Sequence, residues 1–508
     1  MNTPVTTPEP GVAPPRATAR DWAGLAVLAL ALLLLAVDAT VLDLAVPAIS
    51  ADLAPSTPQL LWIIDVYSFV LAGLLVVMGN LGDRIGRRKL LLIGAAGFGI
   101  ASALAAWAGS PEMLIAARVL QGVAGATLMP ATLGLIRSIF QDPRQRTVAI
   151  GVWSAMAGGG AAAGPLVGGW LLEHFWWGSV FLVNLPVMAG LLVLAPLLIP
   201  ESRDPHPGRF DAFSAVLAML ALVPVVYAIK ETAAHGLDLG VLVIGLFGIG
   251  AGVAFARRQR RLADPMLDLR LFALPRFRVA VLTNMLAVFA LAGVLFFGSQ
   301  YLQLVLGRSP LDAGLLMVPG LVASVVGSLT AALLVRRWRA VVVLGGALVV
   351  TALGAAAFFA VDASSGAGAF VLGFTGIGLG AGVAMTVSAD LVVGSAPAER
   401  AGAAAAISET AYEVGLALGV AVLGSTVMAV FRRGLDLSAL PGELSATASD
   451  SLSSAVETAD ALPPSAAGEF LSSVHEAFVS GIHLTVLGMV AVLLFAAITA
   501  VRTKTPRE

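Results

Sequence analysis

The sequence predicts an all-α polytopic membrane protein with fourteen transmembrane helices. Hydrophobic residues make up 58% of the 508 residues, charged residues make up only 12%, and the mean hydropathy is +0.93. Soluble domains carry about twice that charged fraction. Nearly uncharged runs of about 18 or more residues recur along the chain, which is the length that a helix needs to cross a bilayer. The runs do not alternate polar with apolar residues, as strands of a membrane barrel do, so they are predicted to be helices.

The fourteen spans form two bundles of six helices, separated by two extra helices. Residues 1–20, rich in Pro and Thr, form a predicted disordered cytoplasmic tail, and the apolar run that follows is too long for the core of a signal peptide. The N-terminal bundle covers 21–200, the extra helices with their connectors cover 201–275, and the C-terminal bundle covers 276–502, before a cytoplasmic tail at 503–508. The predicted spans are, in order, 22–44, 59–79, 90–109, 112–136, 148–171, 178–199, 212–231, 238–256, 277–300, 312–335, 340–360, 368–393, 402–429 and 480–501.

The distribution of basic residues predicts the orientation. With a cytoplasmic N-terminus, 25 of the 30 Lys and Arg residues fall in cytoplasmic segments, and Arg308, Arg432 and Arg433 face outward. Cytoplasmic loops of membrane proteins carry this excess of Lys and Arg, so both termini are predicted to be cytoplasmic. The preference for Arg over Lys, with abundant Ala and Gly, is typical of GC-rich bacterial genomes and predicts the plasma (inner) membrane.

A faint internal repeat supports the two bundles. Arg87-Arg88-Lys89 leads into LLLIGAA, and Arg336-Arg337-Trp338-Arg339 leads into VVVLGGA, each after the second span of its bundle. Parallel repeats of this kind are typical of transporters whose halves rock about a site near the midplane.

Four motifs in the appropriate spans resemble those of the major facilitator superfamily, and in particular its family of fourteen-helix drug:proton antiporters. Residues 79–89, predicted as a loop between the second and third spans, read GNLGDRIGRRK, and the fourth span carries RVLQG at 118–122. The fifth span carries the antiporter-like GxxxGPxxGG at 160–169, and the first ends in VDATVLDLAVP at 37–47. The resemblance covers about residues 20–430 and implies export of quaternary ammonium compounds, dyes and fluoroquinolones.

The basic loop is a predicted gate. Asp83 is suited to cap a helix N-terminus or to pair with an arginine, and the resemblance implies that it latches the two bundles while the protein is open to the outside. A positive-inside loop without a gating role is the alternative. The gating residues are Gly82, Asp83, Arg84, Gly86, Arg87 and Arg88.

The glycines of the fifth span recur at every fourth residue and predict one smooth stripe for close helix packing. Pro165 adds a bend because it removes a backbone hydrogen bond. Packing alone explains the stripe, and its connection with antiport comes from the resemblance. The antiporter-motif residues are Gly160, Gly164, Pro165, Gly168 and Gly169.

Charged residues inside the spans are the candidate coupling site, because a charge in a bilayer is costly and rare. Asp38, Asp65 and Arg118 lie at similar depth in the outer half, where an ion pair is geometrically feasible. Such an ion pair has either a structural role or a role in transport. Glu409 and Glu413 are four residues apart and share one helix face, with Tyr412 adjacent. By resemblance, both match acidic positions of the same span in a member of the family, and Asp38 matches its first-helix aspartate.

These acids predict proton exchange. Burial disfavours the charged form of a carboxyl group, so such a group holds either a proton or an organic cation. Because Arg118 neutralises one of the first two acids and the glutamates share a proton, we expect lipophilic monocations to be preferred over rigid dications. The expected partners are protons, cationic amphipathic small molecules and the bilayer, with no nucleic acid, and the chain is expected to be a monomer.

Other classes of protein are less compatible with the sequence. An exporter of a self-made antibiotic or a lipid would share all these motifs. A membrane-embedded enzyme is disfavoured because none of the five histidines lies in mid-span beside a Ser or a carboxylate. The chain has no cysteine and no Gly-Lys pair of a phosphate-binding loop, so we expect no cofactor, no metal site and no ATP hydrolysis.

The segment 430–479 is the one sizeable outer region. Between Gly434 and Ser480 it holds seven acids and no Lys or Arg. Apolar residues at helical spacing on either side of Pro463-Pro464 predict an amphipathic helical hairpin. The hairpin either covers the outer mouth or is a solvated loop.

Overall fold

The computed structural model describes residues 16–205, 211–236, 238–262, 265–363, 366–437 and 442–503. Within these ranges the chain consists of helices and short connections, with no strand. The predicted all-α membrane fold is confirmed. Helices begin where a side chain can accept from the first free N–H groups: Thr18 and Ser56 each form a reciprocal capping box.

The first group of helices extends from Ala19 to Leu198. The sixth predicted span is interrupted at Val183, where α6 ends and α7 begins. The helices are α1 (Ala19–Leu53), α2 (Thr57–Ile85), α3 (Arg87–Ala106), α4 (Pro111–Ile139), α5 (Pro143–His174), α6 (Ser179–Leu182) and α7 (Asn184–Leu198).

Two extra helices and a short turn connect this group to the second. They are α8 (Ala212–His235), α9 (Leu239–Gln259) and the 3-10 turn η1 (Leu269–Ala273). The second group comprises α10 (Pro275–Gln300), η2 (Tyr301–Val305), α11 (Pro310–Arg337), α12 (Ala340–Ala356), η3 (Ala357–Ala360), α13 (Gly368–Ser395), η4 (Ala398–Arg400), α14 (Ala401–Leu418), η5 (Gly419–Leu423), α15 (Gly424–Gly434), α16 (Gly442–Asp450), α17 (Leu452–Asp460) and α18 (Pro464–Arg502).

Thirteen helical segments of the described residues are long and apolar enough to cross a membrane. The predicted span 148–171 is not among these thirteen, but it is helical as part of α5, which packs along α1 and α11. The predicted loop at 79–89 differs more: α2 continues to Ile85 and α3 begins at Arg87. Only Gly86, with φ of 110°, interrupts the two helices, in a conformation that L side chains rarely adopt.

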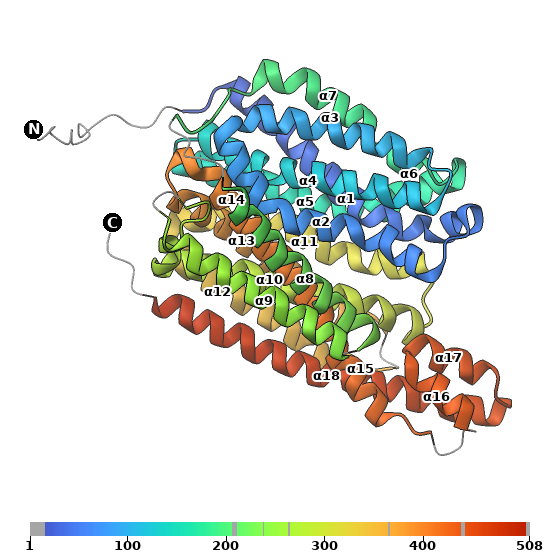
Figure 1. The fold of residues 1–508 in the computed structure, drawn as a ribbon. Helices are drawn as coiled ribbons and strands as arrows, with labels where there is room; N and C mark the ends of the chain where they lie inside the picture. Colours follow the sequence, from blue (N-terminus) through green and yellow to red (C-terminus); the bar gives the residue numbers. More distant parts are fainter. Residues whose placement is uncertain are drawn as a thin grey trace, which may run out of the picture.

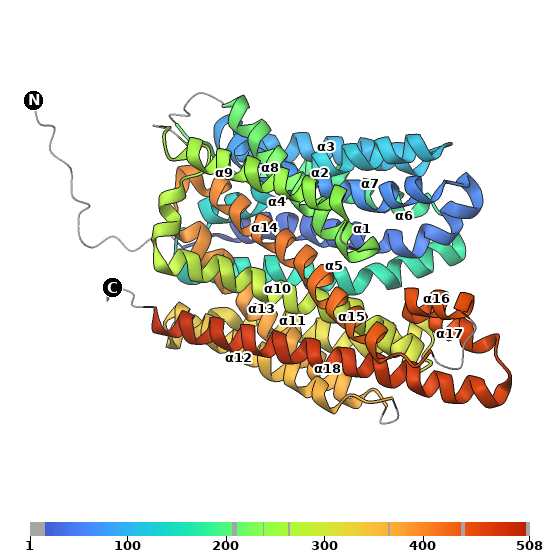
Figure 2. The same ribbon diagram turned by 60° about the horizontal axis from the view of Figure 1, so that its bottom comes forward.

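Figure 1 shows α1–α7 along one side of the molecule and α10–α18 along the other, with the start of α1 and the end of α18 at the same end. We call the end where α1 begins and α18 ends the terminal face, and the other end the far face. Helix α8 packs on α9, on α2 and on α14, so the extra pair lies against both groups (Figure 2). The two groups meet mainly through α5 on α11 and through α14 on α2 and α4.

The far face of the second group carries α16, α17 and the start of α18 (Figures 1 and 2). The predicted hairpin differs here in two ways. Its first arm is broken at Ser451, whose hydroxyl accepts from the Ser454 N–H and starts a new helix. Its second arm is continuous with the last membrane span, because α18 runs without interruption from Pro464. The arms bury Leu452, Val474 and Phe478 against the end of α15, so this region is packed onto the bundle.

Candidate functional site

The first-helix aspartate lies in a buried polar network inside the N-terminal group. Asp38 on α1 is 1% exposed and forms an ion pair with Arg118 on α4, with 3.1 Å between Asp38 Oδ2 and Arg118 Nη1. Asn184 on α7 donates to Asp38 Oδ1 at 2.7 Å, and Gln121 donates to the same oxygen at 3.4 Å. Both amides also donate to the Ser102 hydroxyl on α3. Asp38 thus connects four helices of one group.

Arg118 extends this network to α2 of the same group. Its guanidinium stacks on the Tyr67 ring at 4.5 Å from the ring centre, and its Nε donates to the Ile63 carbonyl of α2. Tyr67 is 4% exposed, and the charges of Asp38, Arg118 and Glu413 all act on its hydroxyl. Tyr67 therefore extends the Asp38 network to α2, the helix on which α14 packs.

Asp65 lies half-buried on α2, two residues from Ile63. The ion pair between Arg118 and Asp38 joins α4 to α1.

The predicted glutamate pair lies on α14, the helix that packs on α2 and α4 of the first group and on α10 of its own. Glu409 is 6% exposed, whereas Glu413 and Tyr412 are half-buried. The two carboxylates interact electrostatically with each other and with the Tyr412 hydroxyl. Among the described residues, Glu409 forms no ion pair with a Lys, Arg or His side chain. This arrangement places a deeply buried carboxyl group at the boundary between the groups.

Asp83 ties the two groups together at the terminal face. Its carboxylate accepts from the N–H groups of Gly402 and Ala403, the first turn of α14, at 2.9 Å each. It also pairs with Arg87 at 2.7 Å, and Arg87 in turn donates to the Glu399 carbonyl of the second group. Asp83 therefore both caps a helix and pairs with an arginine. We call this set of contacts the first clasp.

The other predicted gating residues make contacts within the first group that hold the first clasp in place. Arg84 donates to the Asn80 side chain at 2.8 Å, and Arg88 donates to the Ile199 carbonyl at 2.9 Å. A side chain at Gly86 would overlap the Glu201 carboxylate, and one at Gly82 would press on Leu90. The clasp is therefore built on a tightly packed turn.

A second clasp lies at the terminal face where α5 meets α13. Arg146 Nε lies 2.5 Å from Asp390 Oδ1, and the Thr147 hydroxyl donates to Asp390 Oδ2 at 2.6 Å. The two charged side chains are only 11% and 14% exposed. Arg137 adds a bond to the Val393 carbonyl. Like the first clasp, this one joins the two groups.

The antiporter-motif glycines face α1. A side chain at Gly160 would overlap the Leu33 carbonyl, one at Gly164 would overlap Thr40, and one at Gly168 would overlap Val41. Gly169 points into open space, and the side chain of Pro165 lies outside the described residues. The stripe thus lets two backbones of the same group approach each other closely.

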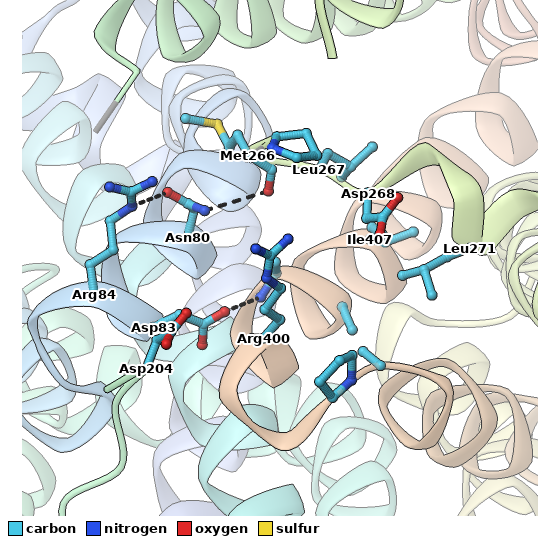
Figure 3. Close-up of a pocket in the computed structure, with 15 residues that line it drawn as sticks. Asn80, Asp83, Arg84, Asp204, Met266, Leu267, Asp268, Leu271, Arg400 and Ile407 are labelled. Carbon is cyan, nitrogen blue, oxygen red and sulfur yellow. Dashed lines mark hydrogen bonds between the residues drawn. The ribbon is translucent and has the colours of Figure 1, made fainter. Parts of the chain in front are cut away.

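A cavity of about 220 Å³ adjoins the first clasp, between α2, α14 and the connector 265–271. Figure 3 shows Asn80, Asp83 and Arg84 on one side and Met266, Leu267 and Asp268 of the connector on another. Met266 is 3% exposed and packs in one apolar cluster with Val76, Val77 and Ile407. The connector is therefore inserted where α2 and α14 meet.

Several members of these networks carry weak sequence signals. Asn184, Gln121 and Ser102 are uncharged polar residues within spans, and such residues occur for many reasons. Asp390 lies three residues from the end of its predicted span, where an acid is commonly exposed. Tyr67 adjoins Asp65 in the second span, and that proximity is the one signal that would have pointed to it. In the described residues, no group of three or more His, Asp or Glu side chains is placed to hold a metal ion.

Comparisons with known proteins agree with the motifs. Residues 28–420 match the profile of the Major Facilitator Superfamily. The chain is 47% identical to the multidrug efflux pump LfrA of Mycolicibacterium smegmatis, over 96% of this chain and 97% of that protein. It is 37% identical to the methyl viologen resistance protein SmvA of Salmonella typhimurium, over 94% and 97% of the two chains.

A further relative and a solved structure extend the comparison. The tetracenomycin C resistance and export protein of Streptomyces glaucescens is 35% identical, over 96% of this chain and 93% of that protein. The human organic anion transporter MFSD10 (TETRAN) shares the fold, with a TM-score of 0.62 at 15% identity, covering 94% of this chain and 100% of that one. The chain belongs to the major facilitator superfamily, in its drug efflux family, and it is a multi-pass membrane transporter.

Proposed function

We propose that this chain exports lipophilic organic cations across a bacterial inner membrane in exchange for protons, acting as a monomer with both termini in the cytoplasm. The observation that carries the proposal is Glu409, a carboxyl group only 6% exposed on the helix that joins the two groups. A buried carboxyl group without a cation is more stable with a proton than with a charge. Glu409 is therefore the proposed proton carrier, and Glu413 beside it shares the charge.

The half-buried acids are the proposed contacts of the cation. Asp65 and Glu413 belong to different groups, and both are more exposed than Asp38 and Glu409. A cation bound near Glu413 disfavours a proton on the adjacent Glu409, because each neutralises the same local negative charge. A bound drug then weakens proton binding, and a bound proton weakens drug binding by the same free energy, as exchange requires.

Asp38 has a different proposed role. Its carboxylate is enclosed by Arg118, Asn184 and Gln121. Removing one member of a buried pair leaves the other charge without compensation. We propose that Asp38 holds Arg118 against Tyr67, and that this contact carries changes at Glu413 to the first group.

The orientation follows from the clasps and the basic residues together. With the terminal face in the cytoplasm, the two clasps close the cytoplasmic side, and the structure corresponds to a state from which drug leaves outward. Opening inward then requires both clasps to break.

Relatives guide the choice of substrates. SmvA is named for resistance to methyl viologen, which carries two fixed positive charges. The charge count predicts that this chain prefers monocations. Efflux of methyl viologen compared with efflux of a monocation therefore tests that preference. A second candidate function, export of a self-made antibiotic, is favoured by the name of the tetracenomycin C exporter. Protection of the producing strain against its own product, without efflux of dyes, would favour that alternative.

The test is ethidium efflux from cells with and without the chain, measured before and after an uncoupler removes the proton gradient. We expect the chain to lower ethidium accumulation and the uncoupler to abolish the difference. Paired assays with ethidium and methyl viologen at matched concentrations then measure the charge preference. Efflux that survives the uncoupler while ATP is depleted would contradict proton exchange.

A further inference from the structure

An apolar groove of about 470 Å³ lies on the outside of the second group, away from both clasps. Helices α11 and α12 both pack along α13, and they barely touch each other. The groove runs between them, with α13 as its floor. Its lining includes Leu334, Trp338, Val342, Gly346, Gly380 and Val383.

The shape of the groove matches one half of a bilayer. It begins at Trp338, which is 54% exposed at the terminal face, and extends along α12 as far as Val350. The ten helical rises of α12 from Ala340 to Val350 span about 15 Å. Half of the hydrocarbon thickness of a membrane is also about 15 Å. A single acyl chain of one leaflet therefore fits its length.

The mouth of the groove is cationic. Arg336, Arg337 and Arg339 surround Trp338 in the connection between α11 and α12, and all three arginines are exposed. An arginine guanidinium matches the geometry of a phosphate group. The same three charges disfavour a lipophilic cation at this mouth, so the transported substrate is a poor occupant.

The corresponding connection in the first group, between α2 and α3, also carries a basic cluster, and there the cluster binds a carboxylate. Between α2 and α3, the Glu201 carboxylate accepts from the N–H groups of Arg88 and Lys89, at 3.0 and 3.1 Å. It also lies 3.9 Å from the Arg88 guanidinium. The first group thus supplies an anion from its own chain at the basic connection.

We propose that the groove between α11 and α12 binds an anionic phospholipid, with one acyl chain between the helices and its phosphate on the arginines of the connection. The lipid phosphate then occupies in the second group the place that Glu201 occupies in the first. The assignment to the cytoplasmic leaflet rests on the proposed orientation. Since α13 forms the floor and also carries Asp390, a bound lipid supports the helix on which the second clasp is built.

Two substitutions test the groove and its mouth separately. A side chain at Gly346 meets open space, so Gly346→Leu fills the groove without disturbing the packing of α12. Arg336→Gln with Arg337→Gln removes two charges. Matched controls are Gly250→Leu, which also meets open space on α9, and Arg257→Gln with Arg260→Gln, two exposed arginines on the same face.

The assay is native mass spectrometry of the purified full-length chain titrated with dioleoyl phosphatidylglycerol, dioleoyl phosphatidylethanolamine or soluble glycerol 3-phosphate. We expect phosphatidylglycerol to bind more tightly than phosphatidylethanolamine, and glycerol 3-phosphate not to compete. Loss of two arginines should weaken phosphatidylglycerol roughly thirtyfold, Gly346→Leu should remove most of the binding, and both controls should bind as the native chain does.

Equal affinity for both lipids, or unchanged binding in Gly346→Leu, would overturn the proposal. So would competition by glycerol 3-phosphate alone, displacement of the lipid by ethidium, or a dimer that Gly346→Leu dissociates, because each assigns the groove to another occupant. The measurement needs no proton gradient and does not record transport, so its failure leaves the proposed export function standing.

Discussion

Replacing Asp390 with Asn is expected to loosen the second clasp and to favour the inward-open state. The native carboxylate accepts from Arg146 at 2.5 Å and from Thr147 at 2.6 Å. Asn keeps the shape of the side chain but removes its charge, and it retains one acceptor oxygen. A hydrogen bond to a charged group contributes about 1.5–3 kcal/mol. Loss of one such bond shifts the equilibrium between states by roughly 10- to 150-fold.

The assay exploits the absence of cysteine from the sequence, since a single introduced thiol is then the only one. Ala404 is 1% exposed and lines the cavity beside the first clasp, so Ala404→Cys reports opening of the terminal face. We expect Asp390→Asn to raise the rate at which maleimide labels this thiol in inside-out vesicles by about tenfold or more. The transport rate should fall, since the outward-open state becomes rare.

A charge exchange provides the control. Arg146→Asp with Asp390→Arg restores the ion pair with its sign reversed, and it should return labelling toward the native rate. Arg146→Asp alone should label as fast as Asp390→Asn. If Asp390→Asn labels at the native rate while the protein folds and inserts normally, the second clasp does not hold the terminal face closed.

The remaining predictions concern the other parts of the site. Asp38→Asn should reduce ethidium efflux to the level of cells without the chain, and unchanged efflux would contradict a central role for the buried network. Glu409→Gln should abolish proton-driven efflux but keep exchange of labelled for unlabelled dye, because only the proton carrier is lost; loss of both activities would point to a binding or folding role instead. Asp83→Asn should slow turnover without changing the equilibrium affinity for dye, and an equal fall in both would refute its role as a latch. Gly164→Val should lower the yield of folded protein because its methyl groups overlap Thr40, whereas Gly169→Val, which meets open space, should not.

The fold was predictable because hydropathy and length dominate in a bilayer. An apolar run long enough to cross the membrane has few alternatives to a helix, and the spacing of glycines in α5 indicates its contact with α1. The depth of Asp38 and Arg118 in their spans likewise limits which charges can meet. The choice between Asp38 and Asp65 depends on the rotation of α1, α2 and α4 about their axes, which hydropathy does not encode.

The second clasp and the connector were not predictable for a different reason. Asp390 and Arg146 are 244 residues apart and belong to different groups of helices. The burial of Met266 depends on an irregular segment that has no periodicity from which to infer a buried face. Contacts between separate bundles join distant parts of the chain, so a single sequence pattern does not reveal them.

Helix α14 connects the gate with the proposed proton site. Its first turn receives the Asp83 carboxylate at Gly402 and Ala403, and Glu409 follows two turns later, about 10 Å along the same axis. Since α14 is an uninterrupted helix over this distance, a shift that exposes Glu409 to the far side also moves the N–H groups that Asp83 holds. In the proposed exchange, release of a proton would leave a buried charge on Glu409, and a movement of the helix that brings the carboxylate toward water or a bound cation would lower that cost. We infer that the state of Glu409 sets the strength of the first clasp through the rigid first half of α14, and that the second clasp, on α13, opposes inward opening independently of it.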